Sequence, residues 1–346
     1  MAETRSRMTG RRRRSMLWSF AAILALAVLA PFGGYVYVGL QEAQAQEEQT
    51  VNPRSEYWRE VRRGAEGYTS VANPEGGVLI NGEGNNWRQL RNGVVATYTP
   101  WLLAVALGGI ALMWLFKGAH KPEEPDSGRM VQRWSLWSRV LHWVVATLFI
   151  VMAFTGTSLL FGRAVLIPWL GHEGFAAYAA YAISMHNYIG PFFSVGILLM
   201  ILTWIRDNLP RAADLQWLKR GGGLLGGKQP PSGKFNAGEK LWFWFIAIFG
   251  TIACVTGLVL DFPNLVQSRE TMQMANLVHG ITTMLWISFF LGHVYMGTVG
   301  TEGALSGMIS GNVSENWARH HHALWYEEVK DQEAPVRKVP TSPQRT

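Results

Sequence analysis

The stretch MANLVHGITTMLWISFFLGHVYMGTV, from Met274 to Val299, decides the fold of this chain. It is long enough to cross a membrane, because about 20 apolar residues span a hydrocarbon core of about 30 Å. It carries two histidines, His279 and His293, fourteen residues apart. On an α-helix this separation is a rise of about 21 Å and a rotation about 40° short of four full turns. Both imidazoles therefore share one helix face, with one near each membrane surface.

Histidine inside a membrane is costly unless it faces the bundle interior and has a partner. Two histidines on one stripe therefore indicate two sites stacked across the membrane. A single such histidine is also compatible with packing or proton relay, so partners on other helices are needed to decide between these uses.

The rest of the chain fits an all-α membrane protein. Of its 346 residues 49% are hydrophobic, and apolar runs of spanning length alternate with short charged stretches. The net charge of +7 is concentrated in particular loops, so it indicates topology and not nucleic-acid binding. The single cysteine, Cys254, lies in an apolar run and excludes both an intrachain disulfide and a thiolate-bound iron–sulfur cluster.

Residues 1–45 have the layout of a secretory signal. Four arginines, Arg11–Arg14, precede an apolar run from Met16 to Leu40, and Ala43-Gln44-Ala45 is a small-x-small cleavage pattern. The run is longer than most signal-peptide cores, so an uncleaved signal anchor fits equally. Either interpretation keeps the arginines in the cytoplasm and places the next segment outside.

Four further regions follow. Residues 46–98 form an expected extracytoplasmic segment with a short helix, a hairpin and Gly-rich turns such as Asn81–Gly84, and residues 99–133 form an extra transmembrane helix (Trp101–Phe116) and a cytoplasmic linker. Residues 134–300 are the four-helix domain, and residues 301–346 are a polar cytoplasmic tail. His120, His172 and the tail histidines, His320–His322, are expected to be solvated.

The loops around the four spans give the orientation. The expected spans are Trp134–Phe161, His186–Ile205, Leu241–Leu260 and Met274–Val299. The loop at residues 206–240 holds seven Lys or Arg residues, whereas those at residues 162–185 and 261–273 hold one each. Positive charge marks the cytoplasmic side, so the basic loop and the C-terminal tail are predicted to be cytoplasmic.

This orientation pairs the histidines by depth. His186 and His279 lie toward the outer face, and His142 and His293 toward the inner face. Two imidazoles suit six-coordinate haem iron, a geometry that favours electron transfer, whereas zinc needs four ligands. Small residues on these helices could admit a flat macrocycle or serve ordinary close packing. They are Gly156, Gly190, Gly257 and Gly292.

The last ~215 residues resemble the γ subunit of respiratory formate dehydrogenase, a quinone-reducing dihaem cytochrome b. The motifs that carry the resemblance are Arg139-Val140-Leu141-His142-Trp143, Met185-His186-Asn187-Tyr188 with Pro191-Phe192-Phe193, Lys234-Phe235-Asn236-Ala237-Gly238-Glu239-Lys240, His279, His293-Val294-Tyr295-Met296, Gly307-Met308-Ile309 and Trp317-Ala318-Arg319-His320-His321.

The resemblance implies two haem b groups, with His142, His186, His279 and His293 as the axial ligands of their iron. It also implies a menaquinone or ubiquinone site at Asn236, Gly238 and Glu239, although the family pattern has Gln in place of Glu239. A titratable Glu could deliver a proton to reduced quinone. The same residues also form a helix-capping pattern, which does not exclude quinone binding.

The expected function is that of the membrane cytochrome b subunit of formate dehydrogenase. It would reduce quinone with electrons from formate in anaerobic respiration, and it would not oxidise formate itself. The implied partners are an iron–sulfur (beta) subunit, a molybdenum or tungsten catalytic (alpha) subunit and lipid of the bacterial inner membrane. The alternatives are a cytochrome b of a hydrogenase or other periplasmic oxidoreductase, and a haem-free membrane anchor or transporter.

Overall fold

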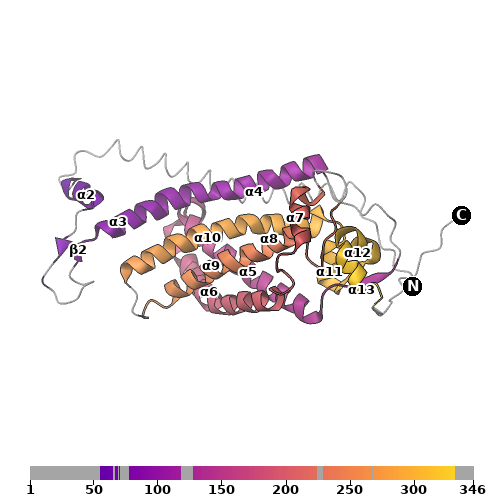
Figure 1. The fold of residues 1–346 in the computed structure, drawn as a ribbon. Coiled ribbons are helices and arrows are strands. Elements are labelled where there is room, and N and C mark those ends of the chain that lie inside the picture. Colours follow the sequence, from indigo (N-terminus) through magenta and orange to yellow (C-terminus); the bar gives the residue numbers. More distant parts are fainter. Residues whose placement is uncertain are drawn as a thin grey trace, which may run out of the picture. The chain divides into compact units, whose positions relative to one another are not determined.

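The computed structural model describes residues 55–64, 67–68, 70, 78–117, 128–223, 229–265 and 268–331. The expected signal segment at residues 1–45, His120 and the end of the tail lie outside these ranges. Helices dominate the described chain, with two small two-stranded sheets (Figure 1). Five helical segments are long and apolar enough to cross a membrane, so the predicted all-α membrane fold class is confirmed.

The five spans are built from consecutive helices, some joined by a π-helical turn. They are α3 Gly82–Gln89, η1 Leu90–Val95 and α4 Ala96–Lys117; α5 Leu136–Val165; α6 Ile167–Trp204; α8 Ala237–Phe245, η3 Ile246–Gly250 and α9 Thr251–Asp261; and α10 Arg269–Tyr295 with η4 Met296–Gly300.

Two of these helices begin much earlier than the sequence pattern indicates. The helix of His186, α6, starts at Ile167 and bends at Gly171, whose φ of 70° suits glycine. Its first half is rich in alanine, a strong helix former that apolar-run analysis undervalues. Likewise Asn81 is not part of a turn, because its side chain accepts a hydrogen bond from Gly84 N and caps α3.

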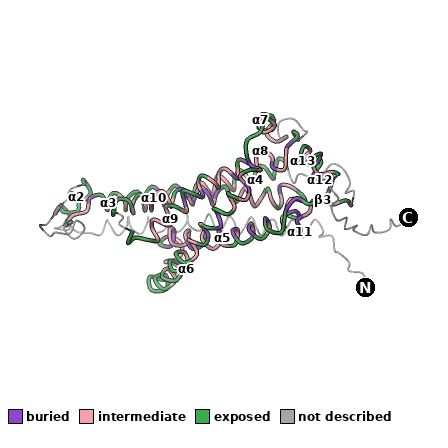
Figure 2. Tube along the Cα trace, turned by 60° about the horizontal axis from the view of Figure 1, so that its bottom comes forward, coloured by how far each residue is buried: buried purple, intermediate pink, exposed green. Residues whose placement is uncertain are grey.

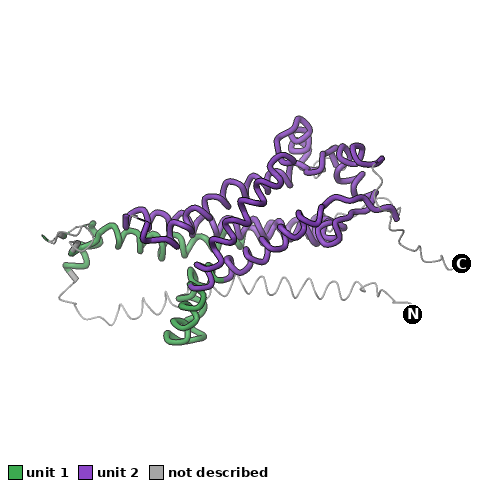
Figure 3. Tube along the Cα trace, turned by 90° about the horizontal axis from the view of Figure 1, so that it is seen from below, with its two compact units in different colours: residues 1–104, 155–183 green, residues 105–154, 184–346 purple. Residues whose placement is uncertain are grey.

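The chain divides into two compact units (Figure 3). The first contains residues 1–104 and 155–183. In it α2, Ser55–Arg62, packs on α3, and β1, Gly67–Tyr68, pairs antiparallel with β2, Val78–Ile80. This agrees with the short helix and hairpin expected there. The ends of α5 and α6 in this unit are joined by a hydrogen bond from Tyr178 to Ser158 of 2.7 Å.

The second unit, residues 105–154 and 184–346, holds the rest of α5 and α6 with α8, α9 and α10. Its core is one apolar cluster to which all four spans contribute. The buried members are Leu141, Val145, Phe149, Phe193, Ile197, Ala253 and Trp286. Cys254 packs against the same cluster, as expected of a small apolar residue.

Outside this core the helices expose apolar surface. Only 22% of the most apolar window of each of the four bundle spans is buried, and most of the helix length is exposed or intermediate (Figure 2). Large side chains such as Phe154, Phe192 and Leu202 are more than 60% exposed. So much contiguous apolar surface fits lipid contact, and the protein is a multi-pass membrane protein.

The second unit also contains a folded C-terminal cap. It consists of β3 Met130–Gln132, β4 Asn312–Ser314, α12 Glu315–His321 and α13 Ala323–Val329, with β3 and β4 antiparallel. Short elements follow two of the spans: α7 Ala212–Lys219 and η2 Gly221–Gly223 lie between α6 and α8, and α11 Ala304–Ser310 lies between α10–η4 and β4. Trp317, Trp325 and Tyr326 form the core of the cap with Val131 and Val313. The described part of the expected polar tail is therefore folded.

Two histidine predictions for this region were wrong. His321 and His322 are 3% and 1% exposed and are not solvated. Both rings pack on Trp317, with centroids 4.9 and 5.0 Å away. His172 is exposed, as predicted.

Candidate functional site

Four histidines of the second unit form two ring pairs, one toward each end of α10. The ring centroids of His142 on α5 and His293 on α10 are 6.2 Å apart, with an angle of 53° between the ring planes. His186 on α6 and His279 on α10 are also 6.2 Å apart, at 86°. The structure thus brings together the same partners that loop charge and helix depth indicate.

The ring of His279 is fixed by its neighbour α9. Its Nδ1 lies 2.9 Å from the carbonyl oxygen of Ala253 and 3.2 Å from Thr256 Oγ1. A carbonyl can only accept, so Nδ1 carries the proton and Nε2 keeps its lone pair. A carbonyl bound to one ring nitrogen is the usual support for a histidine whose other nitrogen binds a metal.

Gly257 on α9 allows this close approach. A Cβ added at Gly257 would lie 3.1 Å from His279 Cε1, tighter than ordinary contact. At Gly292 on α10 an added Cβ would meet nothing within 4 Å, and at Gly190 only Met152 at 3.6 Å. Glycine is therefore favoured at Gly257 by this close approach, whereas a side chain at Gly292 would meet open space.

The other pair is bounded by aromatic rings. Trp242 on α8 stacks on His293 with centroids 4.9 Å apart and planes at 12°. Nδ1 of His142 is buried, and no residue in the described part of the chain gives it a hydrogen bond. An unsatisfied ring nitrogen in a dry interior is unfavourable, so this site is incomplete as protein alone.

Aromatic side chains fill the space between the two pairs. Phe149 contacts Trp286 and Phe290 with ring centroids 4.9 and 4.7 Å away, and Phe193 lies 5.6 Å from Trp286. These rings belong to the buried core, which keeps water away from the middle of the bundle.

The predicted quinone residues lie at the first turn of α8. The Asn236 side chain accepts from Glu239 N at 3.0 Å, and Glu239 accepts from Asn236 N at 2.9 Å. The capping-box alternative is therefore confirmed. Gly238 makes room for Trp217, since its added Cβ would lie 3.0 Å from that ring. Trp242 follows Glu239 by three residues, so both lie on one face of α8.

Glu239 also joins α8 to the C-terminal cap. Arg133 donates to its Oε1 at 2.8 Å and to the carbonyl of Lys234 at 2.9 Å. The Arg133 guanidinium lies 4.9 Å from the Trp317 ring and is almost completely buried. Nε2 of His322 lies 3.8 Å from the other Glu239 oxygen. Burial, with the Arg133 charge, lowers the pKa of His322 to about 4.

Sequence reasoning missed several of these contributors. Trp242 could have been found from its spacing, because it follows Glu239 by three residues on a helix that starts at a clear N-cap. The Ala253 carbonyl and the contacts of Arg133 and His322 give no local signal. Arg133 and Glu239 are 106 residues apart in the chain.

Comparison with known proteins covers the same region. The model of the prokaryotic cytochrome b561 family matches residues 133–311. The nitrate-inducible formate dehydrogenase cytochrome b556(Fdn) subunit of Escherichia coli K12 is 30% identical over 214 residues, which are 60% of this chain and 96% of that protein. The formate dehydrogenase cytochrome b556 subunit of Haemophilus influenzae is 29% identical over 55% of this chain and 80% of its own length. The Escherichia coli K12 cytochrome b556(fdo) subunit is 25% identical over 58% and 93%.

Proposed function

We propose that this chain carries electrons from formate oxidation to quinone through two haem b groups. The premise is that the chain belongs to the prokaryotic cytochrome b561 family and resembles the cytochrome b556 subunits of formate dehydrogenase. The observation that carries this proposal is the presence of two histidine pairs at opposite ends of α10.

The spacing of each pair fits two imidazoles that would hold one iron between them. A metal–imidazole bond is about 2 Å long and each ring adds about 1 Å, so the ring centres should be about 6 Å apart. The observed 6.2 Å in both pairs agrees with this value. The unpartnered Nδ1 of His142 also fits a group that completes the inner site.

Haem b, when bound between the two histidines of a pair, would supply one-electron redox chemistry. The chain's own residues orient the histidine rings that would hold it. The Ala253 carbonyl fixes the tautomer of His279, and Trp242 holds the plane of His293 by stacking. Between the pairs, Phe149, Trp286 and Phe193 exclude water from the interior.

Quinone is proposed to bind near the first turn of α8, at Asn236, Gly238 and Glu239. This turn lies one helical turn before Trp242, and Trp242 contacts His293, so the turn is close to the inner histidine pair. Glu239 is an ion-pair partner of Arg133 and a capping residue, which fixes its carboxylate there.

The orientation and partners complete the proposal. With the basic loop and C-terminal cap on the cytoplasmic side of the inner membrane, the His186/His279 pair faces outward and would receive electrons. The donor would be an iron–sulfur subunit attached to a formate-oxidising molybdenum or tungsten subunit. The His142/His293 pair would then reduce quinone near the cytoplasmic face.

Visible spectroscopy tests the proposal. Reduced-minus-oxidised spectra of the purified protein should show two b-type haems, and His279→Ala should remove one of them. His172→Ala, which changes an exposed histidine, should retain both. A wild-type protein without b-type absorption, or a His279→Ala variant with both haems, would refute the assignment.

A further inference from the structure

His322 is the most buried titratable side chain that the two histidine pairs do not use. It is 1% exposed and lies between α12 and α13. Its Nδ1 is 2.8 Å from the carbonyl of Gly233, so Nδ1 carries the proton. The lone pair is then on Nε2, the atom that lies 3.8 Å from Glu239 Oε2. A proton on Nε2 would form an ion pair between the imidazolium and the Glu239 carboxylate. Without that proton, the Nε2 lone pair faces the negative charge of the carboxylate.

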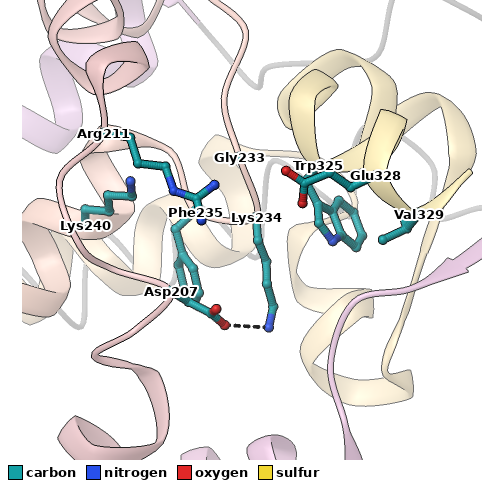
Figure 4. Close-up of a pocket in the computed structure, with 9 residues that line it drawn as sticks. All are labelled: Asp207, Arg211, Gly233, Lys234, Phe235, Lys240, Trp325, Glu328 and Val329. Carbon is teal, nitrogen blue, oxygen red and sulfur yellow. Dashed lines mark hydrogen bonds and ion pairs between the residues drawn. The ribbon is translucent and has the colours of Figure 1, made fainter.

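A cavity lies beside this position, although His322 itself does not line it. Its volume is about 220 Å³, and its lining includes Gly233 and Trp325, both direct neighbours of His322 (Figure 4). Arg211 and Glu328 at its rim are exposed, and Asp207 and Lys234 form an ion pair of 2.7 Å within it. A polar cavity of this size holds several water molecules, so solvent comes within one residue of the buried imidazole.

The charged groups facing His322 are Arg133 and Glu239. Arg133 opposes a positive charge on the ring and keeps the Glu239 carboxylate ionised by direct pairing. The imidazole is therefore neutral at pH 7 and able to accept a proton, and the carboxylate can take that proton in turn. Imidazole is the usual side chain for such a transfer near neutral pH.

We propose that His322 and Glu239 form a proton relay from the cavity to the quinone at the first turn of α8. This inference rests on the proposed function and assigns a role to a residue of the C-terminal cap.

The relay balances as follows. Nε2 of His322 takes a proton from water and forms imidazolium, while Nδ1 keeps its proton and its bond to Gly233. The imidazolium transfers the Nε2 proton to Glu239, and the resulting carboxylic acid protonates a reduced quinone oxygen. Converting one quinone to quinol adds two electrons and two protons. Formate supplies the electrons through the partner subunits, and one of the protons takes this route.

The test uses the complete complex with its formate-oxidising subunits. Haem reduction by formate and quinol formation from decylubiquinone or a short-chain menaquinone are measured between pH 6 and 8.5. H322Q can still donate to the Gly233 carbonyl but cannot relay a proton, and E239Q removes the carboxylate while it keeps a hydrogen-bond acceptor for Asn236. The matched control is H321Q, because His321 is comparably buried against Trp317.

We expect formate to reduce the haems fully in every variant. Quinol formation in H322Q and E239Q should fall at least about tenfold at pH 8 and less at pH 6, where protons are more abundant. Free imidazole in the buffer should restore much of the H322Q loss, and H321Q should behave as wild type.

Two results would overturn the relay. The first is a wild-type rate of quinol formation in H322Q and E239Q at every pH. The second is a loss of quinol formation in H322Q that is equal at every pH, is not restored by imidazole and also occurs in H321Q. Failure of formate to reduce the haems of the wild-type complex would instead refute the proposed function. The two failures are thus distinguishable.

Discussion

Acidification should open the C-terminal cap through His322. The pKa of this ring is lowered from 6.5 to about 4, so the unfolded cap binds more protons than the folded cap between these values. Stability is therefore highest above pH 6.5 and declines as the pH falls toward 4. One pKa unit corresponds to about 1.4 kcal/mol, which gives a loss of about 3 kcal/mol below pH 4 and about 2 kcal/mol at pH 5.

Hydrogen exchange of the cap measures this loss. Amides of residues 312–329 report the opening of β4, α12 and α13, after correction for the intrinsic pH dependence of exchange. Between pH 7.5 and 5, wild-type protection should fall about thirtyfold more than that of H322Q, in which the titrating group is absent. Parallel pH profiles of the two proteins would show that charging His322 does not oppose folding and would refute the reasoning.

Two further substitutions test the site. Gly257→Val should displace the His279 ring, because the first added carbon already lies 3.1 Å from it, and should remove one haem from the visible spectrum. The control Gly109→Val, at a position where an added Cβ meets nothing within 4 Å, should keep both haems. An unchanged spectrum in Gly257→Val would contradict the close approach of α9 to the His279 ring. Asn236→Ala should lower the unfolding free energy by about 1 kcal/mol and raise the KM for quinone. Ser268→Ala, which removes the N-cap of α10, should lower stability similarly in thermal melts; an equal rise in its KM would contradict a specific role of Asn236.

The fold class was predictable because a helix that crosses lipid must be long and almost entirely apolar. Apolar runs located α5, α8–α9 and α10 to within a few residues, since a span without charges has few alternatives. The start of α6 was not predictable in this way. Its first half mixes alanine with His172, Glu173 and two tyrosines, so hydropathy falls although helix propensity stays high.

The candidate site was likewise predictable only in part. The histidine partners could be predicted because depth in a membrane is one-dimensional, and helix direction with loop charge orders residues along it. Lateral contacts follow from packing, which the linear pattern does not contain. Nothing local marks the Ala253 carbonyl as the partner of His279, and the Arg133–Glu239 pair closes only when the cap folds onto α8.

The π-helical turn η3 separates the span into two halves with independent registers. A π turn holds one residue more than an α turn, so the same residues wound as one continuous α-helix would rotate α9 by about 100° relative to α8. Trp242 would remain on His293, while Ala253 and Gly257 would turn away from His279. Removing one residue from Ile246–Gly250 would instead leave an ordinary α turn and keep both contacts. The extra residue in η3 therefore lets α8 contact the inner histidine pair through Trp242 and α9 contact the outer pair through Ala253.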